Sequence, residues 1–313
     1  MQELYQTLKN KGWEGKCNSY QDVIERYELI RRRSEAKISV IVISWRLVKE
    51  TKLNFETLEK QRKEQFELIF VNNGGSDQEF EAILPYVDKY IKLNKNTGAY
   101  KARNIGSVFA ESPLLLFLED DGIPNITFIK SHLEAFEKFD ILCLRGVYKP
   151  LSNSVYNKLA SHYYLGEDPF PALFNLEGNA SVLASCFFEI GGWDDEIKFG
   201  HGGPEFALRL FKKYPDFRKQ IYYPKAIINH DYVKSKEHLQ IKAQRQNASL
   251  LRLKDKHADW DEFVNSWYQY RKKSYLLIRK NPTIKDKCSD MLNFLIERIV
   301  TDILRIVKHQ LKK

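Results

Sequence analysis

The chain has 313 residues, of which 43% are hydrophobic and 29% are charged, as is typical of a globular protein. No apolar run reaches the roughly 18 residues that a membrane-spanning helix needs, and the polar N-terminus lacks the apolar segment of a signal peptide, so we expect a cytoplasmic protein. The four cysteines form no CxxC pair, which argues against a zinc site and against a disulfide framework. The formal charge of +9 indicates an anionic partner without identifying it.

The N-terminal segment is predicted to be polar and helical. Val23, Ile24, Tyr27 and Ile30 recur at helical spacing along one face of it. A run of three arginines then leads into the β-branched run at 37–44, which is typical of a buried strand in a parallel sheet.

Strands and helices alternate through the next part of the chain. Apolar runs predict strands at 37–44, 66–71, 90–93 and 113–118, and helical patterns separate them at 51–64, 78–86 and 98–110. This alternation predicts an α/β fold with a mostly parallel, Rossmann-like sheet flanked by helices. Ligands of such sheets bind beyond the carboxyl ends of the strands. Three polar clusters occupy those positions, namely Ser44-Trp45-Arg46, Asn72-Asn73-Gly74 and Glu119-Asp120-Asp121.

The second half of the chain is less regular. Strands are predicted at 141–147, 179–183 and 221–229, a short helix at 203–213, and longer helices at 238–255, 259–280 and 285–312. These patterns divide the chain into a helical N-terminal extension at 1–36, a central domain at 37–235 and a helical C-terminal region at 236–313.

The acidic cluster Glu119-Asp120-Asp121 is the first candidate site. Three adjacent carboxylates repel one another, so a bound cation would stabilise them. Oxygen ligands suit Mg²⁺ or Mn²⁺, which complete their coordination with substrate phosphates and water. Considered alone, an acidic turn that is solvated or caps the next helix explains the cluster equally well.

A second candidate precedes that cluster, in the segment 96–106. Gly98 permits close approach of the backbone to a ligand, and the N-terminus of the following helix favours an anion. Arg103 is expected to bind a phosphate or to pair with the acidic cluster.

Two further residues have both a chemical and a structural interpretation. Glu205 begins a predicted helix after a glycine-rich loop, where it either takes a proton from a hydroxyl or forms an ion pair with Arg209. His230 follows a predicted strand, and we weigh metal binding and a structural role about evenly.

Together these residues resemble the large family-two group of inverting glycosyltransferases with the GT-A fold. The resemblance covers about residues 37–233. The Asn-x-Gly-(x)₃-Ala-Arg-Asn-x-Gly pattern of the family is matched in full by 96–106, and Glu119-Asp120-Asp121 stands for its Asp-x-Asp motif. The remaining motifs correspond to Ser44-Trp45-Arg46, Val71-Asn72-Asn73-Gly74-Gly75-Ser76-Asp77, the loop Gly191 to Glu196, and Pro204-Glu205.

The resemblance implies direct displacement at the anomeric carbon of a nucleotide-diphosphate sugar, with inversion. Mn²⁺ or Mg²⁺ would bind the diphosphate through Asp121 with Glu119 and His230, and Glu205 would deprotonate the acceptor hydroxyl. The nucleotide would contact Ser44, Arg46, Asn73, Arg103 and Asp120, while Trp193 and Asp194 would shape the sugar and acceptor pocket. Asn72 and Asn73 replace family aspartates that commonly contact the nucleotide, which leaves its base open, although a UDP-sugar is favoured. The acceptor, a glycan, a lipid-linked molecule or another, stays open.

Two other functions fit the same pattern: a retaining transferase, and a catalytically silent nucleotide-sugar-binding or scaffold protein. Nucleic acid is not expected as a partner, because the basic residues form no recognisable binding module. The last helix is apolar on one side and ends in Arg305, Lys308, Lys312 and Lys313. We favour packing of this helix on the core or in a homodimer over peripheral contact with the inner face of a membrane.

Overall fold

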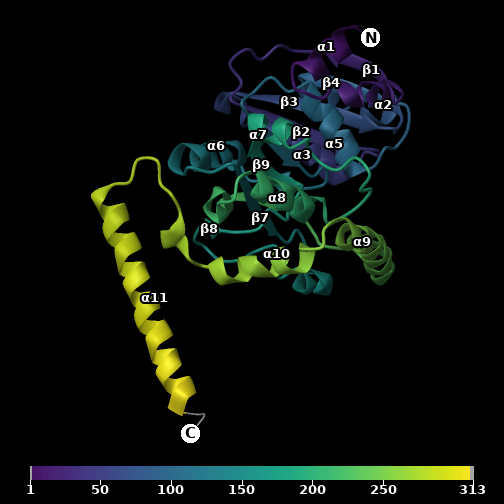
Figure 1. Ribbon diagram of the computed structural model, residues 1–313. Helices are drawn as coiled ribbons and strands as arrows, with labels where there is room; N and C mark the ends of the chain where they lie inside the picture. The colour runs from purple at the N-terminus through teal and green to yellow at the C-terminus, as the bar shows by residue number, and fades with distance from the viewer. Residues whose placement is uncertain (1, 311–313) are drawn as a thin grey trace.

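A single mixed sheet runs through the centre of the molecule, and helices lie on both of its faces (Figure 1). The computed structural model describes residues 2–310, without the side chains of 304–306 and 308–310. Within this range ten strands lie in the order β1-β4-β3-β2-β5-β9-β7-β10-β6, and β8 pairs with β10.

The first half of the sheet is parallel, as predicted. Its strands are β2 (Ile38–Ser44), β3 (Phe66–Asn73), β4 (Lys89–Leu93) and β5 (Leu114–Leu118). They are connected through α3 (Lys49–Glu59), α4 (Asp77–Phe80) and α5 (Ala99–Val108), with short 3₁₀ turns at Arg62–Glu64 and Leu84–Tyr86. Because these strands are parallel neighbours, their carboxyl ends bring the three predicted polar clusters to one edge of the sheet.

The second half makes the sheet mixed rather than mostly parallel. Strand β9 (Asn179–Leu183) lies antiparallel between β5 and β7 (Cys143–Lys149), and β7 is parallel to β10 (Gln220–Asn229). Two short strands, β6 (Ile123–Pro124) and β8 (Phe170–Pro171), pair with β10. The helices here are α6 (Phe128–Lys138) and α7 (Ala184–Glu189), neither of which the sequence patterns predicted, and α8 (Gly202–Lys213), with 3₁₀ turns at Val155–Leu159 and Phe217–Lys219.

The helical prediction for the N-terminal segment is wrong for residues 24–29. Helices α1 (Gln2–Lys9) and α2 (Cys17–Gln21), with a 3₁₀ turn at Glu14–Lys16, are followed by strand β1 (Ile24–Leu29), which pairs antiparallel with β4. The open edge of β4 offers backbone hydrogen bonds to this segment, and Tyr27 stacks on Phe109 with ring centroids 4.4 Å apart. Tertiary pairing therefore outweighs the helical spacing of the apolar side chains.

The C-terminal region contains three helices, α9 (Lys236–Lys256), α10 (Trp260–Ser266) and α11 (Ile284–Gln310). The helix predicted at 259–280 ends early, and residues 267–270 and 274–276 form 3₁₀ turns. Aromatic packing accounts for the turn, because Tyr270 stacks on Phe217 with ring centroids 3.8 Å apart. No helix among the described residues is long and apolar enough to cross a membrane.

Helix α11 projects from the body of the molecule (Figure 1). Its polar face contacts the segment before it, through ion pairs of Arg279 with Asp290 (3.1 Å) and of Lys273 with Glu297 (2.6 Å). The apolar side chains remain 44–61% exposed at Met291, Leu292, Phe294, Leu295, Ile296, Ile299, Val300, Ile303 and Val307. The favoured packing of this helix on the core is therefore not observed. The basic side chains predicted to end it, at 305, 308, 312 and 313, lie outside the described part.

Candidate active site

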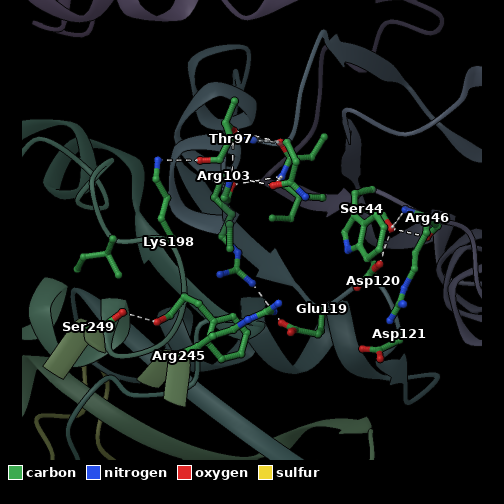
Figure 2. Close-up of a pocket in the computed structure, with 18 of the residues that line it drawn as sticks. Ser44, Arg46, Thr97, Arg103, Glu119, Asp120, Asp121, Lys198, Arg245 and Ser249 are labelled. Carbon is green, nitrogen blue, oxygen red and sulfur yellow. Dashed lines mark hydrogen bonds and ion pairs between the residues drawn. The ribbon is translucent and has the colours of Figure 1, made fainter. Parts of the chain in front are cut away.

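A cleft of about 830 Å³ lies at the carboxyl ends of β2, β3 and β5. It brings together most of the predicted donor-site residues, which Figure 2 shows around the cavity. Those that line it are Ser44, Arg46, Asn73, Arg103, Glu119, Asp120 and Asp121. His230 lies directly behind Asp121, at the end of β10.

Asp120 is held at the floor of the cleft by a hydrogen bond. The Ser44 hydroxyl donates to the Asp120 carboxylate over 2.5 Å, and the Asn54 amide donates to the Glu119 carbonyl over 2.7 Å. Burial, followed by the negative charge of Asp121, raises the pKa of Asp120 to about 7. The cluster therefore holds more negative charge than its own hydrogen bonds can stabilise.

Asp121 and His230 form a pair that can donate one oxygen and one nitrogen to a metal ion. His230 Nε2 lies 3.2 Å from Asp121 Oδ1, and the buried Nδ1 of the same ring has no partner. Burial opposes the charged forms of both groups, but their mutual hydrogen bond prevails, lowering the pKa of Asp121 and raising that of His230. No cluster of three His, Cys, Asp or Glu side chains in the described residues has the geometry of a complete metal site.

Glu119 pairs with Arg103 instead of facing His230. The guanidinium of Arg103 lies 3.1 Å from Glu119 Oε2, and Arg103 is itself only 5% exposed. Gly178, in the turn before β9, makes room for this carboxylate, because a Cβ there would lie 1.7 Å from Glu119 Oε2. The alternative that Arg103 pairs with the acidic cluster is therefore confirmed, and this pair places a cation beside the cleft.

Asn73 fixes the loop that precedes α5. Its Oδ1 accepts a hydrogen bond from the Thr97 backbone over 2.9 Å, and its Nδ2 donates to the Gly98 carbonyl over 3.3 Å. Gly98 adopts a φ of +87°, in the left-handed region that favours glycine, and α5 begins at the next residue. The loop therefore presents the start of α5 to the cleft, as the sequence predicted.

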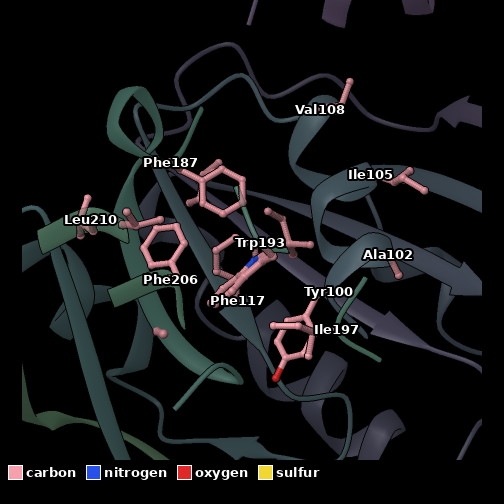
Figure 3. Close-up of a cluster of buried hydrophobic side chains, with 14 of the residues drawn as sticks. Tyr100, Ala102, Ile105, Val108, Phe117, Phe187, Trp193, Ile197, Phe206 and Leu210 are labelled. Atoms are coloured by element: carbon pink, nitrogen blue, oxygen red, sulfur yellow. The ribbon is translucent and has the colours of Figure 1, made fainter. Parts of the chain in front are cut away.

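The structure does not bring the predicted acceptor-site residues to the cleft. Trp193 is a core residue, 1% exposed, and packs on Phe117 and Phe206 with ring centroids 5.0 Å apart (Figure 3). The prediction that it shapes a sugar pocket is wrong, because the surrounding aromatic cluster encloses its ring. Asp194 accepts a hydrogen bond from the Glu196 backbone (2.9 Å) and pairs with Lys256 (2.8 Å).

Glu205 is also enclosed. Its carboxylate is fully buried and accepts two hydrogen bonds of 2.7 Å from Arg209, one turn along α8. His257 lies 3.4 Å from the same carboxylate, and Lys256 lies 3.7 Å away. An acceptor hydroxyl has no access to a carboxylate in this position, so the geometry corresponds to the structural ion pair rather than to an exposed base.

Sequence reasoning missed one wall of the cleft, which α9 forms. His238, Arg245, Ser249 and Arg252 line the cavity from this helix, and Lys198 lines it from the loop after α7. The helix itself was predicted, and the spacing of its basic residues by three and four positions was the signal that could have identified this face.

A model of the family described as Glycosyl transferase family 2 matches residues 39–193, which include Ser44, Asn73, Arg103 and the acidic cluster. The chain carries a family 2 glycosyltransferase domain. One relative, the teichoic acid poly(glycerol phosphate) polymerase of Staphylococcus epidermidis, is 34% identical over 111 residues. That match covers 33% of this chain and 15% of the much longer relative.

Solved structures of two transferases share the fold of this chain. S. aureus TarS 1–349 in complex with UDP has a TM-score of 0.52 at 17% identity, covering 74% of this chain and 70% of that one. The mannosyltransferase PcManGT from Pyrobaculum calidifontis, in complex with GDP-Man and Mn²⁺, has a TM-score of 0.52 at 12% identity, covering 76% and 69%. At these identities the likeness shows a common GT-A-like fold.

Proposed function

We propose that the protein transfers a sugar from a nucleoside diphosphate to an acceptor hydroxyl, with inversion at the anomeric carbon. The observation that carries this proposal is the acidic cluster after β5, which faces a cleft large enough for a nucleotide sugar and shared with Asn73 and Arg103. The family 2 domain and the nucleotide complexes of two proteins with the same fold support a nucleotide-diphosphate donor. We favour a UDP-sugar.

Asp121 and His230 are the residues that would hold Mn²⁺ or Mg²⁺. The position of His230 Nε2 beside Asp121 Oδ1 and the excess negative charge around Asp120 fit a cation at this point. Such ions use few protein ligands and complete their coordination with phosphate oxygens and water, which fits a pair rather than a full cluster. The ion would neutralise charge on the departing diphosphate.

We propose Glu196 as the residue that deprotonates the acceptor. Among the described residues, the carboxylates that line the cleft are the three of the acidic cluster and Glu196. The cluster is committed to the donor and its ion, so Glu196 is the carboxylate left to receive a proton. Asp194 positions it through the backbone hydrogen bond, and Arg252 pairs with it from α9.

We also propose that α11 seats the enzyme on an anionic membrane surface. Its sequence from 284 to 313 carries seven basic and four acidic residues. Three of the acids, Asp286, Asp290 and Glu297, are paired with Arg279 or Lys273 of the preceding segment. Pairing leaves the helix with a basic excess beside a wide exposed apolar face, the combination that binds an interface containing anionic lipids.

A thermal-shift screen tests the donor site. UDP, GDP, CDP and dTDP and their sugars are each added with and without Mn²⁺, and we expect one nucleotide to raise the melting temperature in a metal-dependent way. Asp121→Asn should remove the metal-dependent part, whereas Lys254→Gln, which breaks an exposed ion pair with Asp261, should not. A folded protein that no nucleotide stabilises would refute the proposed function and favour a silent scaffold.

A further inference from the structure

One face of α9 carries a row of basic side chains that is longer than a nucleotide sugar. Its positions follow one another at intervals of three or four residues, which places them on one side of the helix. The row consists of the basic residues His238, Lys242, Arg245, Arg252 and Lys256 with the hydroxyl of Ser249 among them, and we call it the α9 ladder. At 1.5 Å of rise per residue it extends for about 27 Å.

The α9 ladder faces the cleft along most of its length. His238, Arg245, Ser249 and Arg252 line the cavity, and Figure 2 shows Arg245 and Ser249 opposite the donor-site strands. At the far end, Lys256 lies 2.8 Å from Asp194, behind the loop that carries Glu196. The ladder therefore runs from the acidic cluster past the proposed base.

The charge of this face exceeds what the donor requires. The diphosphate of a nucleotide sugar carries two negative charges, which one divalent ion would neutralise, and Arg103 lines the same cleft beside Glu119. Among the described residues, Arg245 has no carboxylate within ion-pair distance and instead lies over the ring of Phe199. Lys198 and Arg46 also line the cleft, and neither makes an ion pair with a carboxylate of the described residues. A second anionic ligand would use these charges.

We propose that the α9 ladder binds the acceptor, and that the acceptor is a linear chain of phosphodiester-linked polyol units. Basic side chains recur along the ladder with the Ser249 hydroxyl among them, so an extended chain with several phosphates can follow it, and phosphates would replace Glu196 and Asp194 as the partners of Arg252 and Lys256. The hydroxyls between the phosphates would then pass Glu196. This inference rests on the proposed function, whose acceptor it specifies.

The composition of α9 itself favours a base-free chain over a nucleic acid, although Trp45 and Phe199 line other parts of the cleft. Single-stranded nucleic acids are bound by basic grooves in which aromatic side chains stack on the bases. Helix α9 contains no Phe, Tyr or Trp, and its exposed apolar residues, Ile241 and Leu251, are aliphatic. The helix therefore offers charge without a stacking surface.

The test measures binding of a fluorescently labelled poly(glycerol phosphate) chain of about ten units to the full-length protein at several salt concentrations. The double variant Arg245→Gln/Arg252→Gln is compared with Lys254→Gln, which removes a charge from the same helix but pairs with Asp261 outside the cleft. We expect the double variant to weaken binding at least tenfold and to reduce the slope of log K against log salt by about 1.4. Lys254→Gln should change neither quantity by more than twofold.

Equal affinity of the wild type and the double variant would overturn the proposal, as would an equal loss in Lys254→Gln. An oligodeoxynucleotide of the same charge that binds as tightly would overturn the assignment to a base-free chain. Nucleotide binding is measured in parallel by thermal shift. If the wild type binds a nucleotide but not the polymer, only the proposed acceptor is refuted. If it binds the polymer but no nucleotide stabilises it, the proposed function is refuted.

Discussion

His132 should make the stability of this fold depend on pH, and the size of this pH dependence can be worked out from the structure. The ring is fully buried on α6, with Nδ1 2.8 Å from the Ser181 hydroxyl and Nε2 3.2 Å from Asn179 Oδ1. The Asn179 amide donates to the carbonyls of Val147 and Ala226, so its oxygen must face the histidine. The neutral ring therefore carries its proton on Nε2 and accepts at Nδ1.

Burial lowers the pKa of His132 from 6.5 to about 3. Between these values the unfolded chain binds a proton at this position and the folded chain does not, so the free energy of unfolding falls as pH falls below 6.5. For one such group the loss between pH 7.5 and pH 5.0 is about 2 kcal/mol. Groups elsewhere in the chain add their own dependence, which a comparison of variants removes.

The measurement is urea-induced unfolding of the wild type and of His132→Gln at both pH values. Glutamine keeps a donor near the position of Nε2 but does not titrate, so its loss on acidification should be about 2 kcal/mol smaller than that of the wild type. Phe136→Leu, on the same helix and 6% exposed in the wild type, is the control: it destabilises the core but should keep the full loss. Equal losses in the wild type and His132→Gln would refute the reasoning.

Four further results are expected. Glu196→Gln should lower kcat by at least a hundredfold while nucleotide binding persists, and unchanged turnover would remove Glu196 from the role of base. Glu205→Gln should lower the free energy of unfolding by about 3 kcal/mol, because Arg209 loses its buried partner; a folded variant without turnover would restore Glu205 as the base. Gly178→Ala should displace the Glu119 carboxylate and lower kcat by a larger fraction than it lowers the free energy of unfolding. Equal fractional losses of the two quantities would contradict this expectation. Removal of residues 284–313 should abolish sedimentation with anionic vesicles; a monomer–dimer change in light scattering, with vesicle binding intact, would assign α11 to a second copy.

The parallel half of the sheet and its donor-site residues could be predicted from the sequence because both depend on local patterns. Strand β5 is an uninterrupted apolar run and β2 is broken only by Ser39 before it ends at Ser44, and a buried parallel strand needs little else to be recognised. Ser44 is the last residue of β2 and Asp120 lies two residues after β5, so finding the strands places both side chains at the same edge. The hydrogen bond between them confirms this placement.

The errors arose where the environment of a residue is set by distant parts of the chain. Residues 24–29 have helical spacing, but the open edge of β4, some sixty positions later, decides their conformation. Trp193 stands in a motif associated with an acceptor pocket, yet aromatic rings from β5 and α8 enclose it. The spacing of residues within either segment does not indicate that β4 pairs with the first or that aromatic rings enclose the second.

The two walls of the cleft differ in how readily they can be recognised from the sequence. One wall follows from the ends of parallel strands and from motifs inside the stretch that the family model matches, and it forms the proposed donor site. The other wall is α9, whose residues lie more than a hundred positions after the acidic cluster and outside the stretch that the family model matches. Because α9 lies beyond the matched stretch, its charges can differ without altering the proposed donor site, in keeping with its proposed role in binding the acceptor. The basic face of α9 is therefore the part of the cleft that bears most directly on the proposed acceptor.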